Sequence, residues 1–254
     1  MSDIKAYTDR VKERHREAFE LWRVVAATYR RAQETGRRRP TDLHVVLDML
    51  LLQASNTHAA LALLAQHGLM EDAATMVRRL MEISIQSTYI AADDQQRTRD
   101  RRAGAYLAFL WRRLPRRTKL LLPPTLRAGW SVTARRFGRF VPKKAKRWGP
   151  DWRTMFRECH AEDLYLSDYS FLSGIAHGSP EEQILRFSAP QIRAHDDRHV
   201  SAVLVYGSKY LAIVGEHWNG LFGVIPAGTV DTLRNQLVAW KPTRRRGGAA
   251  RHDA

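Results

Sequence analysis

The chain has 254 residues, of which 44% are hydrophobic, and this is enough apolar side chain for a substantial core in one large or two small domains. Its formal net charge of +16 indicates attraction to phosphate backbones, anionic membrane surfaces or acidic partners. Cys159 is the only cysteine, which excludes an internal disulfide and a Cys-x-x-Cys metal site.

The N-terminal segment predicts one long amphipathic helix over residues 3–33, with apolar residues such as Tyr7, Val11 and Trp22 on one broad face. The segment is charged from its third residue and has no apolar run of the kind found in signal peptides. We therefore expect a cytoplasmic protein.

Two further helices are expected before residue 95. Thr41 or Asp42 is suited to cap a helix over residues 43–67 that is apolar almost all round, and Gly68 is suited to end it. The next pattern is helical from Glu71 onwards and is also largely apolar. The helix over residues 43–67 is therefore expected to be buried on most sides.

The remaining elements are also read as helical. Residues 95–114 predict a helix that ends at Pro115, whereas the proline-rich stretch 115–150 has no sustained period and predicts an irregular basic insertion. Further helices are expected at 151–160, 163–176, 199–221 and 228–240. No strand series appears, so we predict an all-α bundle in a single domain over residues 1–240.

The C-terminal tail, residues 241–254, is basic and lacks an apolar face, which predicts disorder. The most apolar stretch that precedes it is interrupted by Lys209, Glu216 and His217, so no membrane span is expected.

A polar row lies near the end of the helix predicted over 163–176. Tyr169, Ser173 and His177 follow one another at four-residue spacing, which places them on one side of a helix, where their side chains can touch in sequence. Gly178 and Pro180 also suit a purely structural reading, in which one helix stops and another starts. Both readings stay open at this point.

A second polar set lies on the helix that begins near Glu71. Glu82 follows Arg79 by three residues and Arg78 by four, and either arginine can pair with it along the helix. Because the neighbouring residues are apolar, Glu82 is expected to be at least partly buried and to need a partner. We predict that it lies within direct or one-water hydrogen-bonding reach of Tyr169, Ser173 or His177.

The two segments together, "MVRRLMEISIQSTYI" and "LYLSDYSFLSGIAHGS", resemble a bacterial family of helical proteins classed as a domain of unknown function. Its members carry an Arg-x-x-(x)-Glu helix followed by Tyr-x-x-x-Ser-x-x-x-His. The resemblance implies a bundle in which the matching positions converge as a candidate catalytic set: Arg79, Glu82, Tyr169, Ser173 and His177.

This family is distantly similar to HEPN-type helical domains, many of which are ribonucleases or RNA-associated proteins in toxin and phage-defence systems. Such nucleases use an Arg-x(4-6)-His motif. That motif does not precede His177, where positions 170–172 are Ser, Phe and Leu. In an RNA-cleaving reading, His177 would be the base and Arg79 would stabilise the developing phosphorane charge.

The basic residues are concentrated in one stretch. Between Arg97 and Arg147 there are 17 Lys and Arg residues and one acidic residue, Asp100, so the whole net charge of +16 falls there. Aromatic residues are interleaved with them, which suits the binding of single-stranded nucleic acid, although the same aromatics could instead pack on the bundle. The candidate nucleic-acid contacts are Arg112, Arg113, Arg116, Arg117, Lys119, Arg135, Arg136, Arg139, Lys143 and Lys144.

The sequence thus predicts a helical protein that binds RNA or another polyanion and has a ribonuclease-like polar site. The alternative is a non-catalytic interaction or regulatory module in which the polar residues only fix the core. No cofactor or metal is predicted, because His195, Asp196, Asp197 and His199 lack an established ligand spacing. A homo-oligomer is compatible with either reading.

Overall fold

The computed structural model describes residues 2–34, 41–142, 144, 146–170, 172–173 and 199–240, and within them every regular element is helical. The α-helices are α1 Ser2–Arg14, α2 Arg16–Glu34, α3 Asp42–Gln66, α4 Met70–Ala91, α5 Gln96–Arg113, α6 Arg116–Leu121, α7 Pro124–Phe137, α8 Trp152–Glu158, α9 Glu162–Leu164, α12 Val200–Phe222 and α13 Ala227–Ala239. A 3₁₀ turn, η1, covers Gly138–Phe140, and a π-helical turn, η2, covers Tyr165–Tyr169. The predicted all-α class is confirmed.

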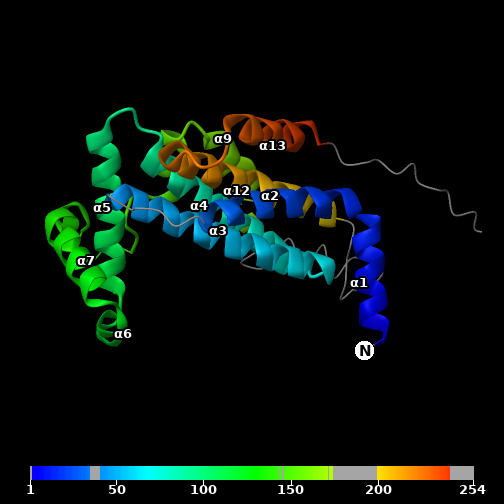
Figure 1. Cartoon of the computed structure of the whole chain (residues 1–254), viewed down its shortest axis with the longest axis horizontal. Helices are drawn as coiled ribbons and strands as arrows, with labels where there is room; N and C mark the ends of the chain where they lie inside the picture. Colours follow the sequence, from blue (N-terminus) through cyan, green and yellow to red (C-terminus); the bar gives the residue numbers. More distant parts are fainter. Residues whose placement is uncertain are drawn as a thin grey trace, which may run out of the picture.

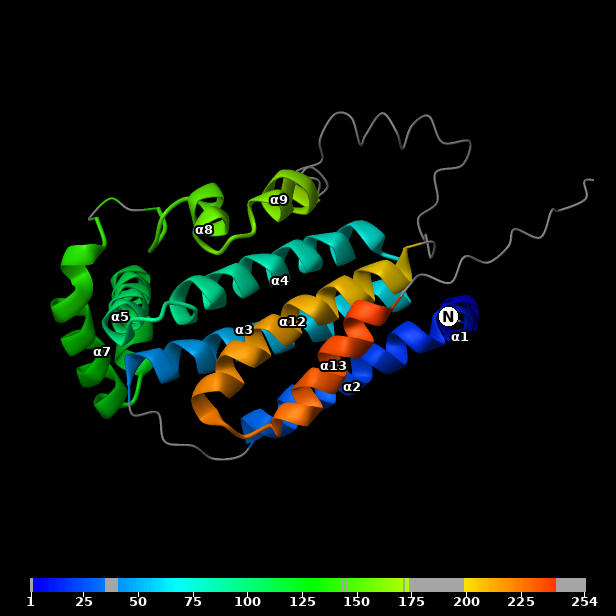
Figure 2. The same cartoon turned by 90° about the horizontal axis from the view of Figure 1, so that it is seen from above.

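The long helices α2, α3, α4 and α12 form the central bundle, and α13 packs on α12 (Figure 2). The apolar pattern of α3 explains its place, because it packs against α2, α4, α5 and α12. Thr41 caps α3, as one of the two predicted alternatives, and Gly68 follows it with a φ of 69°. Glycine adopts this left-handed conformation without a steric penalty.

Two glycines let α12 approach its neighbours closely. A Cβ atom at Gly207 would overlap the Leu61 side chain of α3, and one at Gly215 would overlap the Tyr29 ring of α2. The Tyr29 hydroxyl, in turn, donates to the Ala212 carbonyl of α12 at 3.3 Å. Because these two glycines have no side chain, Leu61 of α3 and Tyr29 of α2 can pack directly against the backbone of α12.

The single N-terminal helix expected over residues 3–33 is instead two helices, separated at His15. Figure 1 shows α1 turned away from α2 at one end of the bundle. His15 Nδ1 lies 2.7 Å from the Ser201 hydroxyl of α12, and Thr8 Oγ1 lies 3.2 Å from His67 Nδ1 just beyond α3. These contacts fix α1 across the bundle end, and no Gly or Pro marks the break in the sequence.

The insertion predicted to be irregular contains α6, α7 and η1, and these elements form an ordered arm together with α5. We call the described residues of 97–147 the basic arm; it stands at the opposite end of the bundle from α1 (Figure 1). Phe137 of α7 is buried against Gly104 of α5, where a Cβ atom would overlap its ring. The Thr133 hydroxyl of α7 lies 3.1 and 3.3 Å from the two carboxylate oxygens of Asp42 at the start of α3.

None of the described helices is both long enough and apolar enough to cross a membrane. The predicted disordered tail, residues 241–254, lies outside the described residues.

Candidate functional site

Glu82 lies at the centre of a polar cluster between α4 and η2. Its side chain is buried, which is unusual for a charged residue. The residue is only 9% exposed. Its Oε2 atom accepts a hydrogen bond from Arg79 at 3.1 Å, and its Oε1 atom lies 3.3 Å from Nε of Arg78. The spacing along the helix left open which of the two arginines pairs with Glu82. In the structure both of them do.

The local sequence explains how a carboxylate comes to lie there. Leu80, Met81 and Ile83 are fully buried around Glu82, so the same turn of α4 that enters the core takes the carboxylate with it. Arginines three and four residues earlier are the positions from which a cation can reach it on a helix. Pairing with two guanidinium groups offsets the cost of removing the charge from water.

Tyr169 completes the cluster from η2. Its hydroxyl donates to Oε1 of Glu82 at 3.3 Å and accepts from Arg78 at 3.3 Å, while the Arg78 guanidinium lies 5.2 Å from the ring centroid. Burial raises the pKa of Tyr169, so this phenol is protonated at neutral pH and can donate. The predicted contact between Glu82 and Tyr169 is confirmed.

The polar row predicted from Tyr169 onwards begins in the π-helical turn η2 and not in a regular α-helix. The Tyr165 and Tyr169 rings stack at 5.3 Å with an interplanar angle of 17°, and the Ser170 hydroxyl donates to the Tyr165 carbonyl five residues earlier. Ser173 is half-buried and helical. His177 lies outside the described residues, so its contact with Ser173 or Glu82 stays a prediction.

The contacts of the cluster favour a structural role for Glu82. Each oxygen of Glu82 already contacts a donor, so the carboxylate is better suited to hold η2 against α4 than to accept a proton from a substrate. Arg79 differs from Arg78, because its side chain is 40% exposed and can reach a ligand while it still contacts Glu82. A catalytic role for the set depends on whether His177 joins it.

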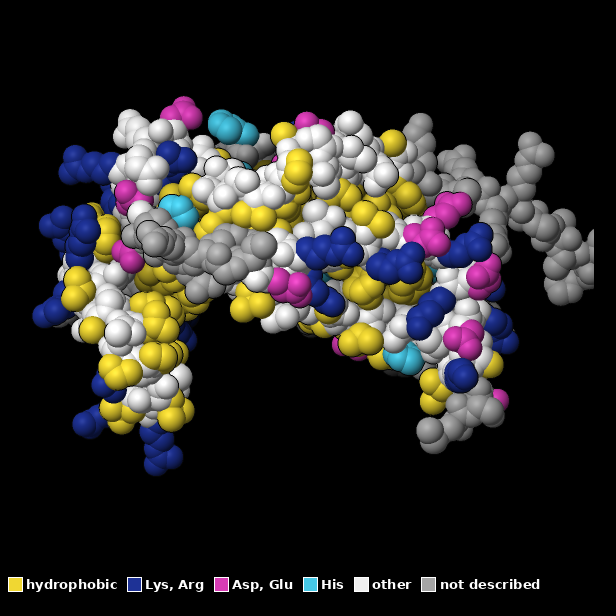
Figure 3. Space-filling model, in the orientation of Figure 1, with side chains coloured by type: hydrophobic (Ala, Val, Ile, Leu, Met, Phe, Trp, Pro, Cys, Tyr) yellow, Lys and Arg dark blue, Asp and Glu magenta, His cyan; other side chains and the backbone are white. Residues whose placement is uncertain are grey.

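The cations of the basic arm are largely at the surface. Of the candidate nucleic-acid contacts, Lys119 is half-buried, Lys143 lies outside the described residues, and the exposed ones are Arg112, Arg113, Arg116, Arg117, Arg135, Arg136, Arg139 and Lys144. In Figure 3, Lys and Arg side chains follow the outer edge of the arm and its free end.

Arg112 has an internal role that its spacing did not reveal. Its guanidinium donates to the carbonyls of Gly138, Val141 and Pro142 at 3.0 to 3.1 Å. Because these bonds close the chain after α7, Arg112 is a structural residue of the arm as well as a surface cation.

The aromatic residues of the arm mostly pack inward. Tyr106 and Phe137 are buried, as is Trp148 directly after the arm, and Trp111 packs edge-on against Trp130 at 6.5 Å. These aromatic residues therefore pack within the protein and do not form a surface for stacking bases. Phe140 is different, because it is 42% exposed.

Two cations lie near the Phe140 ring. The guanidinium carbons of Arg101 and Arg139 are 5.9 and 4.9 Å from its ring centroid. An exposed ring that contacts two arginines can stack on a base while the cations contact phosphates.

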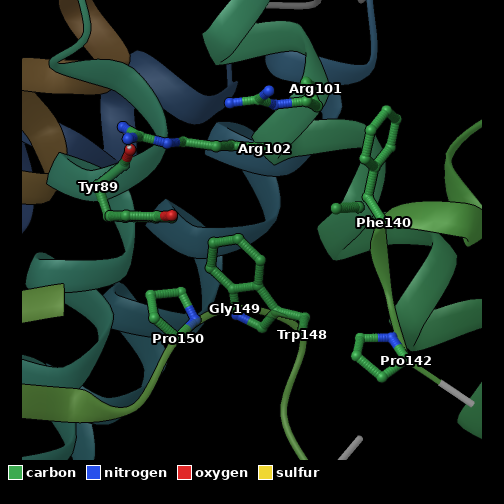
Figure 4. Close-up of a pocket in the computed structure, with 9 residues that line it drawn as sticks. Tyr89, Arg101, Arg102, Phe140, Pro142, Trp148, Gly149 and Pro150 are labelled. Atoms are coloured by element: carbon green, nitrogen blue, oxygen red, sulfur yellow. Dashed lines mark hydrogen bonds between the residues drawn. The ribbon is translucent and has the colours of Figure 1, made fainter. Parts of the chain in front are cut away.

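A pocket of about 350 Å³ opens beside Phe140, between the end of α4, α5 and the chain at 148–150. Figure 4 shows Arg101 and Arg102 at one side of it and the Trp148 ring at the other. Arg102 is held in place, because it donates to the Tyr89 carbonyl at 2.6 Å and pairs with Glu158 at 3.3 Å. The sequence gives no local signal for this pocket, since its walls come from four separate segments.

Among the described residues, no three His, Cys, Asp or Glu side chains lie close enough together to hold a metal ion. Of the histidine and aspartate residues considered near 195–199, only His199 belongs to the described part.

Comparison with known protein families gives a match. The model of a family described as "Family of unknown function (DUF5677)" matches residues 44–189, more than half of the chain. The matched segment includes the Arg78, Arg79, Glu82 and Tyr169 cluster and the whole basic arm. No curated protein and no solved structure matches the chain.

Proposed function

The chain belongs to the DUF5677 family of unknown function, and from the geometry of its matched segment we propose that it binds single-stranded RNA along the basic arm. The observation that carries this proposal is the exposed Phe140 ring with the guanidinium groups of Arg101 and Arg139 near it. Stacking on a ring beside phosphate-binding cations is how proteins hold unpaired strands without reading their sequence.

The charge of the arm supports a phosphate ligand. Its cations lie on α5, α6, α7, η1 and the chain after η1, with Asp100 as the one acidic residue between Arg97 and Arg147. Fixed positive charge of this density draws a polyanion and releases its counterions on binding. The cations are spread along the arm and around Phe140, which suits a strand that follows the surface.

The family resemblance extends the proposal to RNA cleavage beside Glu82. Glu82 and Tyr89 are seven residues apart on α4, about 10 Å along the helix axis, so the polar cluster and the Phe140 pocket are close neighbours. In this reading Arg79 stabilises charge on the phosphate and His177 is the base.

An anionic membrane is the second candidate, and one observation favours it. Leu120 and Leu121 on α6 are 62% and 84% exposed beside Arg116 and Arg117. Exposed leucines next to cations are typical of segments that lie in a membrane interface.

Binding of a fluorescently labelled single-stranded RNA at increasing salt tests the proposal. Arg135→Ala/Arg136→Ala on α7 should weaken binding and reduce the salt slope by about 1.4, since each phosphate contact on a single strand contributes about 0.7. The matched control is Arg30→Ala/Arg31→Ala, an exposed adjacent pair on α2.

Equal losses in both pairs would show attraction by total charge and would overturn the assignment to the arm. Binding to phosphatidylserine vesicles without RNA affinity, lost in Leu120→Ser/Leu121→Ser, would instead select the membrane.

A further inference from the structure

The pocket beside Phe140 has the lining of a site for a planar ring that is linked to a negatively charged group. Its walls are aromatic and prolyl, with Phe140, Trp148, Pro142 and Pro150, and its polar groups are Arg101, Arg102 and Tyr89. Ligand sites are typically concave, mostly apolar and provided with a few polar groups that orient the ligand. A volume of about 350 Å³ is at the small end of such sites.

The aromatic walls are fixed by their own packing. Trp148 is buried and meets the Tyr106 ring edge-on at 5.1 Å and the Tyr89 ring at 5.7 Å. Arg102 lies 3.9 Å from the centroid of the Tyr89 ring. These contacts hold the pocket open without a ligand, so little ordering is needed when one enters.

The two arginines of the pocket differ in role. Arg102 pairs with Glu158 at 3.3 Å and with Asp93 at 3.7 Å, so carboxylates already balance its charge. Arg101 is exposed and faces Phe140. It is therefore the cation of the pocket that can contact a phosphate at the mouth while a ring lies inside.

Tyr89 supplies a polar group inside the pocket. Its hydroxyl points toward the space next to Trp148 (Figure 4). Burial raises the pKa of Tyr89, so the hydroxyl is protonated at neutral pH and can both donate and accept a hydrogen bond. The edge of a nucleobase carries donors and acceptors that match such a group.

We propose that this pocket takes one unstacked nucleobase of the bound RNA, with Phe140 as the stacking ring, Tyr89 at the base edge and Arg101 on the adjoining phosphate. The inference rests on the proposed function and narrows it, because a base inside a duplex is stacked and paired and cannot enter. The protein should therefore prefer single strands to duplexes of the same length, although the duplex carries more phosphates.

The experiment uses the full chain and a 12-nucleotide RNA that carries one 2-aminopurine, whose fluorescence falls when it is stacked. The RNA is measured alone and as a blunt duplex, with the wild type, Phe140→Leu and Arg101→Ala. Phe140→Leu keeps an apolar side chain without the ring, and circular dichroism confirms that each variant is folded. The controls are Val132→Ala, an exposed apolar residue of α7, and Arg97→Ala, an exposed arginine of α5 outside the pocket.

The expected result is quenching of 2-aminopurine by the wild type and a preference for the single strand. Phe140→Leu should abolish the quenching and weaken single-strand binding by about fivefold or more, as the loss of one base stack requires. Arg101→Ala should weaken binding more than Arg97→Ala.

Two outcomes would overturn the inference, and they are distinguishable. Tight single-strand binding without quenching, equal for Phe140→Leu and Val132→Ala, would leave an RNA-binding arm with no base pocket. Absence of RNA binding by the wild type would remove the proposed function and the base pocket together.

Discussion

The Tyr169 hydroxyl lies 3.3 Å from Oε1 of Glu82, and this contact joins η2 to α4 across 87 positions of the chain. Glu82 is also the carboxylate on which Arg78 and Arg79 converge. With the Tyr169 hydroxyl and the two arginines, each carboxylate oxygen of the buried Glu82 has a partner.

This cluster predicts strong coupling between Glu82 and Tyr169 in stability. Glu82→Ala leaves two arginines beside a buried gap and should cost about 3 kcal/mol, as when one partner of a buried ion pair is removed. Tyr169→Phe removes one hydrogen bond to a charged group and should cost about 1.5 kcal/mol. Urea unfolding of both single variants and the double variant measures the coupling, and strictly additive losses would show that the contact contributes nothing.

Catalysis by the cluster is tested separately from its role in packing. If His177 is the base, His177→Ala should slow RNA cleavage by about 100-fold or more and leave RNA binding by the arm unchanged. His199→Ala, an exposed histidine at the start of α12, is the matched control. A lower melting temperature for His177→Ala with unchanged cleavage would establish the structural role.

A pH-dependent stability term is expected from His58 in the core. Its Nε2 atom lies 2.9 Å from the Ser208 hydroxyl, which itself donates to the Leu204 carbonyl, so the neutral imidazole carries its proton on Nε2. Burial lowers the pKa of His58 from 6.5 to about 3. Between these two values the unfolded chain binds a proton that the folded core excludes, so stability falls as pH falls through this window.

The size of this effect follows from the linkage. It reaches about 1.4 kcal/mol per pH unit, or roughly 2 kcal/mol on going from neutral pH to about pH 5, and none of it appears above the unfolded pKa. Urea unfolding of the wild type and His58→Gln at both pH values measures it. The variant should lose less stability on acidification, and equal losses would mean that other groups cause the acid sensitivity.

The attachment of the arm can be tested at a glycine. Gly104→Ala places a methyl group where the Phe137 ring lies, so it should cost about 1 to 3 kcal/mol and weaken RNA binding as α7 shifts. Gly129→Ala on α7 is the control, since no atom lies within 4 Å of its added Cβ. The control should be neutral or slightly stabilising, and RNA binding by Gly104→Ala at the wild-type level would show that the position of α7 is unimportant.

The sequence predicts the helices well because their apolar residues keep a helical period over many turns. The helix over residues 43–67 is an example, and the structure places α3 at Asp42–Gln66. The break at His15 was missed for a physical reason: its cause lies in Ser201 of α12 and in the docking of α1 against the bundle end. A helix pattern reports the local period and contains no information on such distant contacts.

In the candidate site, too, the local pairs could be predicted from the sequence and the contacts between distant segments could not. The pairing of Glu82 with Arg78 and Arg79 follows from positions on one helix, and Tyr169 is one of the three partners expected from the need of a buried carboxylate. The pocket beside Phe140 was missed, because its walls meet only when α5 and the chain at 148–150 come together beside α4. Arg112 was assigned to the ligand alone, because the carbonyls that it holds lie 26 to 30 residues away.

The bond from Thr133 to Asp42 has a consequence for how relatives of this protein can diverge. It ties the inward side of α7 to the first residue of α3, and Phe137 on the same side is buried against Gly104. The opposite side, with Arg135 and Arg136, lies at the surface. Evolution can therefore alter the ligand preference of the arm by exchanging outward residues, while the scaffold beneath stays the same.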